Sequence, residues 1–435
     1  MTAILLMFNL FVLLTAYLVI KTVREALILS GGGAEVKSYA AAGQALLLLL
    51  VVPWYGSFAS KVNRIKLING VTLFFISHLV AFYMLAQLQE VPLGVAFFLW
   101  VGIFDLLVIA QFWAFANDLY TREQGERLFA IVAFGGALGA ILGPMLAGWL
   151  FGPLGAYQLM LVAAALLAIS IVITNAVSSR ENGRRQTDPA KADTEAPLGK
   201  EGGFALVLGH RYLFLIAVLM VVLNLVNTTG EFVLGKTVAE EAKRAVVTEE
   251  QQSVAVGDKG KLTSAQRERI VQAFIGKFYA DFFFRVSLVG AALQLFLVSR
   301  ILKYVGVSGA LFFLPVISLA AYSLMAFFPI LGYIQLAKIF ENSTDYSLQN
   351  TARQTLFLPT SREAKYKAKA AIDTFFVRIG DVLSAVVVFI GTYWLLNTKA
   401  FATINIALVA VWLVLVAVIG RHYKKLALAE VKTAA

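Results

Sequence analysis

Long runs of apolar residues, separated by short polar connections, dominate the hydrophobic pattern of this chain. A helix needs roughly 20 predominantly apolar residues to cross the hydrocarbon core of a bilayer. Windows of that length predict about twelve membrane-spanning helices, so we expect an all-α, multi-pass membrane protein. The windows lie near residues 3–29, 37–58, 69–88, 92–118, 127–151, 156–177, 205–234, 274–299, 306–327, 331–357, 369–396 and 401–420.

Lysine and arginine gather in every second connection between these helices, and the connections in between carry few of them. Basic residues mark the cytoplasmic side of a membrane protein. Both termini are therefore expected in the cytoplasm, with the chain in a cell membrane that we take to be a bacterial inner membrane. The basic clusters are Lys61, Arg64 and Lys66; Arg122 and Arg127; Arg180, Arg184 and Arg185; Arg300 and Lys303; Arg362, Lys365 and Lys367; and Arg421, Lys424 and Lys425.

The composition agrees with this class and excludes several functions. Hydrophobic residues make up 60% of the 435 residues, charged residues 14%, and the mean hydropathy is +0.79, which no soluble domain needs. The net charge of +11 follows from the topology, so no nucleic-acid partner is expected. Without cysteine, and with three scattered histidines, the chain cannot build a thiolate or histidine metal centre. We expect neither a metal nor a cofactor.

The polar segment 178–204 divides the chain, and its Gly, Pro and mixed charges are typical of a cytoplasmic linker. It separates a predicted N-terminal half, 1–177, from a C-terminal half, 205–425, with six helices each. The halves share weak similarity, since Glu25 and Glu231 both lie near the end of the first helix of their half. Two six-helix repeats predict a major facilitator-type fold.

Three charged residues stand within one turn of the first predicted helix, namely Lys21, Arg24 and Glu25. An ionisable side chain at mid-membrane costs on the order of 3 kcal/mol, so such residues are expected to pair or to line an aqueous cavity. Lys21 and Glu25 are four residues apart and are predicted to pair, which leaves Arg24 to face an anion. In the alternative, Lys21 and Arg24 lie near the helix end and extend to the lipid headgroups.

A stripe of polar residues follows about four turns of the helix predicted at 331–357. We predict that it lines a water-filled central cavity; a buried charge network and misplaced helix ends are the alternatives. By contrast, the glycine series from Gly135 to Pro144 predicts close helix packing, and Asp281 with Arg285 predicts an i, i+4 ion pair. The stripe consists of Lys338, Glu341, Asn342, Asp345, Gln349 and Arg353.

Catalytic motifs are missing from the chain. The string GDKGKLTS resembles a phosphate-binding loop, but Ala255 stands where its first glycine should be and Leu262 where a Ser or Thr would bind magnesium. Neither GxSxG nor HExxH occurs. The chain is therefore not expected to be an enzyme.

Five strings carry a resemblance to a known family. They are KTVREALILSGGGAEVKSY from Lys21, FWAFANDLYTREQGERLF from Phe112, NLVNTT from Asn224, AFIGKFY from Ala273 and DYSLQNTARQTLFLPTSREAKYKAKAAIDTFFVRIG from Asp345. They resemble the ATP/ADP translocase family, the nucleotide transporters of plastids and of obligate intracellular bacteria. The resemblance runs through nearly the whole chain and implies a major facilitator-type fold that exchanges nucleotides, with a nucleotide site between the halves.

Some positions depart from the family pattern. Asn227 stands where the family has Glu, Glu231 where it has Lys, and Gln354 where it has Glu beside a basic residue. These changes of charge leave the nucleotide and the exchange stoichiometry open. The positions that keep their charge are Arg24 and Glu25 (Lys and Asp in the family), Asp105 and Arg353.

Nucleotide phosphates need cations, and the bidentate guanidinium of arginine suits phosphate oxygens. Arg24 and Arg353, with Lys21 and Arg378, are the candidates for this role, and Tyr346 is a candidate for the base. We expect a monomer in the lipid bilayer that moves a small anionic substrate by alternating access, with unpaired arginines hindering the empty carrier. The expected substrate-binding residues are Lys21, Arg24, Asp105, Asn227, Glu231, Asp345, Tyr346, Arg353 and Arg378.

Two other functions remain open at this point. The first is proton-coupled transport of another organic anion or a lipid-like solute, with Asp105, Glu231 or Asp345 as the titrating group. The second is a membrane sensor that does not transport, in which the long polar segment 236–272 binds a partner. We predict that this segment is a partly helical, extracytoplasmic insertion, because TSAQRERIVQAFIGK has a helix cap and helical spacing. The sequence does not identify the solute, the coupling ion or the direction of transport.

Overall fold

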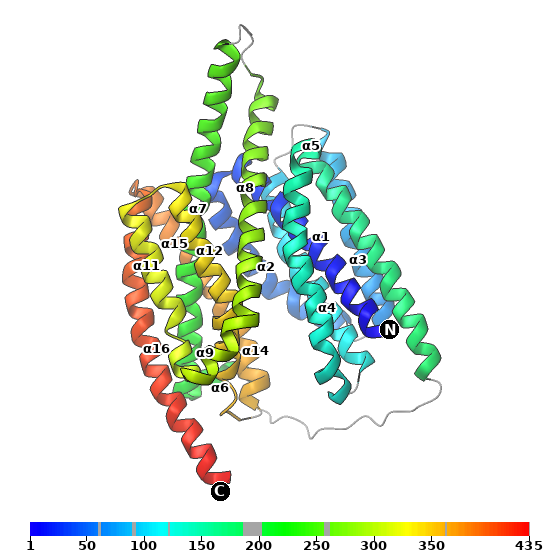
Figure 1. Cartoon of the computed structure of the whole chain (residues 1–435), viewed down its shortest axis with the longest axis vertical. Helices are drawn as coiled ribbons and strands as arrows, with labels where there is room; N and C mark the ends of the chain where they lie inside the picture. Colours follow the sequence, from blue (N-terminus) through cyan, green and yellow to red (C-terminus); the bar gives the residue numbers. More distant parts are fainter. Residues whose placement is uncertain are drawn as a thin grey trace. The chain divides into compact units, whose positions relative to one another are not determined.

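The structure of the protein is a computed structural model that describes residues 1–59, 62–88, 93–120, 122–185, 202–255, 262–361 and 363–434. All regular elements in these ranges are helical (Figure 1). The α-helices are α1 (Thr2–Gly31), α2 (Gly33–Ala59), α3 (Arg64–Ala86), α4 (Leu93–Leu119), α5 (Arg122–Arg185), α6 (Gly203–Gly209), α7 (Arg211–Ala255), α8 (Ser264–Leu293), α9 (Ser299–Tyr304), α10 (Gly306–Ala310), α11 (Phe313–Phe327), α12 (Leu331–Thr344), α13 (Asn350–Thr355), α14 (Lys369–Ala371), α15 (Val377–Tyr393) and α16 (Thr398–Ala434). Four π-helical turns join some of them: η1 (Gln294–Val298), η2 (Asp345–Gln349), η3 (Ala364–Ala368) and η4 (Ile372–Phe376).

Among the described residues, ten helices are long and apolar enough to cross a membrane. The prediction of an all-α, multi-pass membrane protein is therefore confirmed. The expected helices 127–151 and 156–177 both fall within α5, which leaves helical geometry at Gly155 (φ 80°, ψ 178°), a backbone conformation suited to glycine. The charged segment 331–355, which holds α12, η2 and α13, is not among the ten. A count of twelve helices remains a prediction.

The described chain forms two compact units, each assembled from separate stretches of sequence. Unit 1 consists of Met1–Ala40, Leu50–Asp193 and Val238–Ser287, and unit 2 consists of Ala41–Leu49, Thr194–Thr237 and Leu288–Ala435. Helices α2, α7 and α8 therefore contribute residues to both units. The division of the chain into halves at 177 and 205 remains a prediction.

In unit 1, α1 packs against α5, and α3 and α4 pack beside them. Glycines on α5 permit this contact because they face backbone atoms of α1. A Cβ atom at Gly135 would lie 2.0 Å from the carbonyl oxygen of Met7, and one at Gly139 would lie 2.4 Å from that of Phe11. The prediction that this glycine series serves helix packing is confirmed.

The polar segment between the spans of α7 and α8 is largely helical where the structure describes it. Figure 1 shows the end of α7 beside the start of α8, and within unit 1 Arg267 forms an ion pair with Glu250 at 2.8 Å. The first turn of α8 is closed by a capping box. The backbone N–H of Thr263 donates to Gln266 Oε1 at 2.8 Å, and the N–H of Gln266 donates to Thr263 Oγ1 at 3.3 Å. The helical part of the prediction for 236–272 is confirmed for the described residues, whereas its extracytoplasmic side remains a prediction.

In unit 2, α11 packs against α12 and α16. Two polar side chains connect these helices to the first half of α7. Tyr322 of α11 and Asn405 of α16 both donate to the carbonyl oxygen of Val226, at 3.1 Å each. A backbone carbonyl that accepts hydrogen bonds from two other helices fixes the position of α7 beside the charged residues of α12.

The contact between α1 and α5 gives a test of the fold. Gly139→Leu is expected to destabilise the protein by about 1–3 kcal/mol or more, because the added side chain meets the α1 backbone. Gly70→Leu in α3 is the matched control, since a Cβ atom there meets nothing within 4 Å. Thermal unfolding in detergent should show a lower midpoint for Gly139→Leu than for Gly70→Leu. Equal midpoints would contradict the proposed packing.

Candidate functional site

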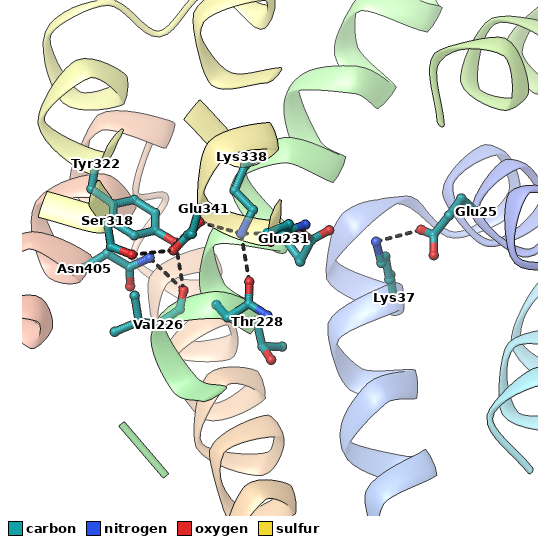
Figure 2. A network of polar contacts seen from close by, with 12 residues as sticks. Glu25, Lys37, Val226, Thr228, Glu231, Ser318, Tyr322, Lys338, Glu341 and Asn405 are labelled. Carbon is teal, nitrogen blue, oxygen red and sulfur yellow. Dashed lines mark hydrogen bonds and ion pairs between the residues drawn. The ribbon is translucent and has the colours of Figure 1, made fainter. Parts of the chain in front are cut away.

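The first group of charged residues lies in unit 1, around Glu25 of α1. Arg24 donates to Glu25 Oε1 through Nη2 at 2.5 Å and through Nε at 3.1 Å. Lys37 of α2 forms an ion pair with Glu25 Oε2 at 2.6 Å (Figure 2). We call Lys21, Arg24, Glu25 and Lys37 the Glu25 cluster. The prediction that Lys21 neutralises Glu25 and leaves Arg24 unpaired is wrong, because Arg24 and a lysine from the next helix occupy the carboxylate.

Each cation of the Glu25 cluster also lies over an aromatic ring. Such contacts stabilise a cation without neutralising it, and they are strongest where water is excluded. The distances from cation to ring centroid are 4.6 Å for Lys21 over Phe283 and 5.9 Å over Tyr17, 4.7 Å for Arg24 over Phe98, and 5.3 Å for Lys37 over Tyr279. The rings come from α1, α4 and α8, so these helices are positioned around the cations.

Asp105 of α4 is the other acidic candidate of unit 1, and it is half-buried. It interacts electrostatically with Arg24. Three cations, Lys21, Arg24 and Lys37, therefore stand against two carboxylates, Glu25 and Asp105.

The second group of charged residues lies in unit 2, around the fully buried Lys338 of α12. Its ammonium contacts Glu341 Oε2 at 2.7 Å, Glu231 Oε1 of α7 at 3.4 Å and Asn227 Oδ1 at 2.9 Å. Asn342 donates to Glu231 Oε1 at 3.0 Å. We call these five residues the Lys338 cluster. It brings the candidates Asn227 and Glu231 together on one cation.

Glu341 is held from its other side by α11. The hydroxyl group of Ser318 donates to Glu341 Oε1 at 3.0 Å, and the single O–H of Tyr322 is shared between this oxygen, at 2.9 Å, and the carbonyl oxygen of Val226 (Figure 2). Lys338 is 0% exposed and Glu341 3% exposed. For these two members of the stripe, the expected water-filled cavity is wrong, and the alternative of a buried charge network is what the structure shows.

Arg353, further along the same helical segment, has no carboxylate at ion-pair distance among the described residues. It donates to Asn350 Oδ1 at 3.1 Å and contacts Met220 Sδ at 3.8 Å. Its buried Nε atom has no hydrogen-bond partner. Asp345, one of the candidates, interacts with it electrostatically. The Arg353 side chain thus has at least one N–H donor without an acceptor.

The remaining candidates fall into different surroundings. Tyr346, in the π-helical turn η2, is 56% exposed, whereas Arg378 of α15 forms an ion pair with Asp381 at 3.1 Å. Asp381 also accepts hydrogen bonds from Asn224 and Thr228 of α7, at 2.7 and 2.9 Å. Arg378 therefore has a fixed partner on its own helix, and Asp381 connects α15 to α7.

Sequence reasoning did not select Lys37 as a candidate, although it lies near the end of the first of the strings that resemble the nucleotide transporters. Its position in a second helix concealed its partner. Lys338 and Glu341 were recognised as polar but were not counted among the binding residues. Among the residues that the structure describes, no three His, Cys, Asp or Glu side chains are grouped closely enough to hold a metal ion.

The fold of the chain is similar to that of several solved transporters. The nucleoside transporter NupG has 13% identity and a TM-score of 0.59, with 98% of each chain covered. A bacterial homologue of the iron transporter ferroportin, in an inward-facing state, has 13% identity and a TM-score of 0.63 over 96% of this chain and 98% of that one. A POT family transporter in complex with 5-aminolevulinic acid has 13% identity and a TM-score of 0.61 over 98% and 96%. The protein is a multi-pass membrane protein with the fold of major facilitator-like transporters.

Residues 95–423 match the TLC ATP/ADP transporter family, so the chain belongs to that family. None of the curated proteins shows a significant match. The family and the structural relatives are transporters and not enzymes, which confirms the absence of catalysis predicted from the motifs. A sensor that does not transport finds no support in these similarities.

The Lys338 cluster gives a prediction for stability. Lys338→Met should destabilise the protein by about 3–5 kcal/mol, because it leaves the buried Glu341 carboxylate without its counter-ion. The double variant Lys338→Met/Glu341→Gln removes both charges and should recover part of the loss. Thermal unfolding in detergent measures both. A single variant as stable as the wild type would contradict the cluster.

Proposed function

We propose that this protein transports nucleotides across a cell membrane by alternating access, and that Arg24 and Arg353 bind nucleotide phosphates during the cycle. Membership of an ATP/ADP transporter family supports the substrate class. The proposal includes twelve membrane helices and cytoplasmic termini, as the hydrophobic and charge patterns predict, and a monomeric protein.

The observation that carries the proposal is the unsatisfied Nε donor of Arg353. A partly buried guanidinium whose buried Nε atom has no hydrogen-bond partner retains part of the planar donor set that binds phosphate oxygens in pairs. Its neighbours Asn350 and Met220 do not neutralise it. A phosphate is an anionic partner of the right geometry, and binding one would remove the cost of the unsatisfied donor.

The other candidates take roles that their surroundings support. Tyr346 is exposed and offers a ring for stacking the base. Arg378 has its charge matched by Asp381, so we assign it to positioning α15 and not to phosphate binding. Excess cationic charge in the empty transporter opposes its return without substrate, which favours exchange of one nucleotide for another.

The role of Arg353 predicts a loss of nucleotide affinity on substitution. Arg353→Ala removes a hydrogen bond to a charged group, worth about 1.5–3 kcal/mol, so the Kd for ATP and ADP should rise about 10- to 100-fold. Titration calorimetry of the purified protein in detergent measures this change. Arg300→Ala is the matched control, because Arg300 is an exposed cation outside the proposed site.

Two results would count against the proposal. Unchanged affinity in Arg353→Ala would remove Arg353 from the site. Absence of binding by any nucleotide to the folded wild type would contradict nucleotide transport itself.

A second candidate function, proton-coupled transport of another organic anion, rests on Glu231. This carboxylate is 23% exposed and shares Lys338 with the buried Glu341. Two carboxylates that share one lysine repel each other, and proton uptake by one of them would relieve this repulsion. Of the two carboxylates, Glu231 is the one that water reaches.

Uptake measured against pH separates the two functions. With proton coupling, uptake should rise as the external pH falls, and Glu231→Gln should abolish this dependence while keeping an acceptor for Asn342. With nucleotide exchange, uptake should change little with pH in both proteins. Asp281→Asn is the matched control, since Asp281 is an exposed carboxylate whose partner is Arg285.

A further inference from the structure

Two cations form ion pairs with the single negative charge of Glu25. Arg24 occupies Oε1 and Lys37 occupies Oε2, at 2.5 and 2.6 Å. Glu25 is 1% exposed and Lys37 12% exposed. Arg24 and Lys37 are thus arranged as in an anion-binding site, and the Glu25 carboxylate occupies the place of the anion.

Lys37 is stabilised by an aromatic ring, which does not neutralise its charge. Lys37 lies over the ring of Tyr279, at 5.3 Å from its centroid. Among the described residues, Glu25 is its polar partner, although an ammonium group has three N–H donors. Arg24 likewise bonds Glu25 through Nε and Nη2, which leaves donors on Nη1. Both cations can thus accept a second anionic partner.

We propose that Lys37 is a phosphate-binding residue, which Glu25 holds in the empty transporter and a distal phosphate of the nucleotide takes over when substrate binds. Nothing in the family resemblance assigns this role to Lys37. The inference rests on the proposed function and deepens it, because it names the substrate class. A second phosphate group adds negative charge that a monophosphate lacks, so Lys37 selects nucleoside di- and triphosphates over monophosphates.

Glu25 has a defined part in this selection. It keeps Lys37 and Arg24 paired while the site is empty, which lowers the cost of burying them. It also competes with the incoming phosphate. Removing the charge of Glu25 should therefore lower the stability of the ligand-free protein and raise its affinity for anions. If the ion pair were purely structural, its loss would lower the stability without raising the affinity.

The first test compares nucleotides on the full-length protein in detergent. Kd values for ATP, ADP and AMP are measured by titration calorimetry for the wild type, Lys37→Gln, Lys37→Arg and the control Lys66→Gln, an exposed lysine of α3. In Lys37→Gln, the Kd for ATP and ADP should rise about 10- to 100-fold and that for AMP less than about threefold. Lys37→Arg should restore ATP binding to within about threefold of the wild type, and Lys66→Gln should match the wild type.

The second test does not depend on removing Lys37. Glu25→Gln should unfold at a lower temperature than the wild type without ligand, and inorganic pyrophosphate should stabilise it by a larger shift than the wild type. An equal or smaller shift would overturn the proposed competition. This measurement decides the matter if Lys37→Gln does not fold.

The outcomes also separate this inference from the proposed function. If the wild type binds ATP and ADP but Lys37→Gln weakens ATP, ADP and AMP equally or not at all, Lys37 is not a phosphate-selecting residue and nucleotide transport stands. If the folded wild type binds no nucleotide, the proposed function fails first.

Discussion

The need to pair each charge that lies among membrane helices governs the organisation of this protein. An ionisable group in the hydrocarbon region is costly unless another charge or a hydrogen bond satisfies it. Each unit meets this need with a different stoichiometry. Around Glu25, two cations share one carboxylate, whereas around Lys338 two carboxylates share one cation. The first arrangement is the basis of the proposed phosphate site, and the second is the basis of the alternative proposal of proton coupling.

The π-helical turn η2 marks a change of surroundings along the polar stripe. A π-turn adds a residue to a helical turn, and such turns are frequent at functional sites. The extra residue rotates everything after it by roughly 100° around the helix axis. Lys338 and Glu341, which precede η2, are buried in a charge network. Tyr346 within the turn is exposed, and Arg353 beyond it keeps an unsatisfied Nε atom.

Patterns within one helix could be read from the sequence, and contacts between helices could not. The i, i+4 pair of Asp281 and Arg285 is present at 2.9 Å, and the glycine series packs against α1 as predicted. The partner of Glu25 was predicted wrongly because the sequence offers Lys21 on the same helix and does not show that Lys37 arrives from the next one. The stripe was misjudged at Lys338 for a related reason, since the sequence does not show that Asn227 and Glu231 reach this lysine from α7.

Transport of phosphate-bearing nucleotides across a bilayer is the central requirement of the proposed function. The most direct measurement is uptake of radiolabelled ATP into liposomes that contain the purified protein, with ADP or no nucleotide inside. We expect uptake well above that of protein-free liposomes when ADP is inside, and much less uptake when the liposomes contain no nucleotide. Uptake no greater than in protein-free liposomes, with folded protein present and ADP inside, would contradict the proposed function.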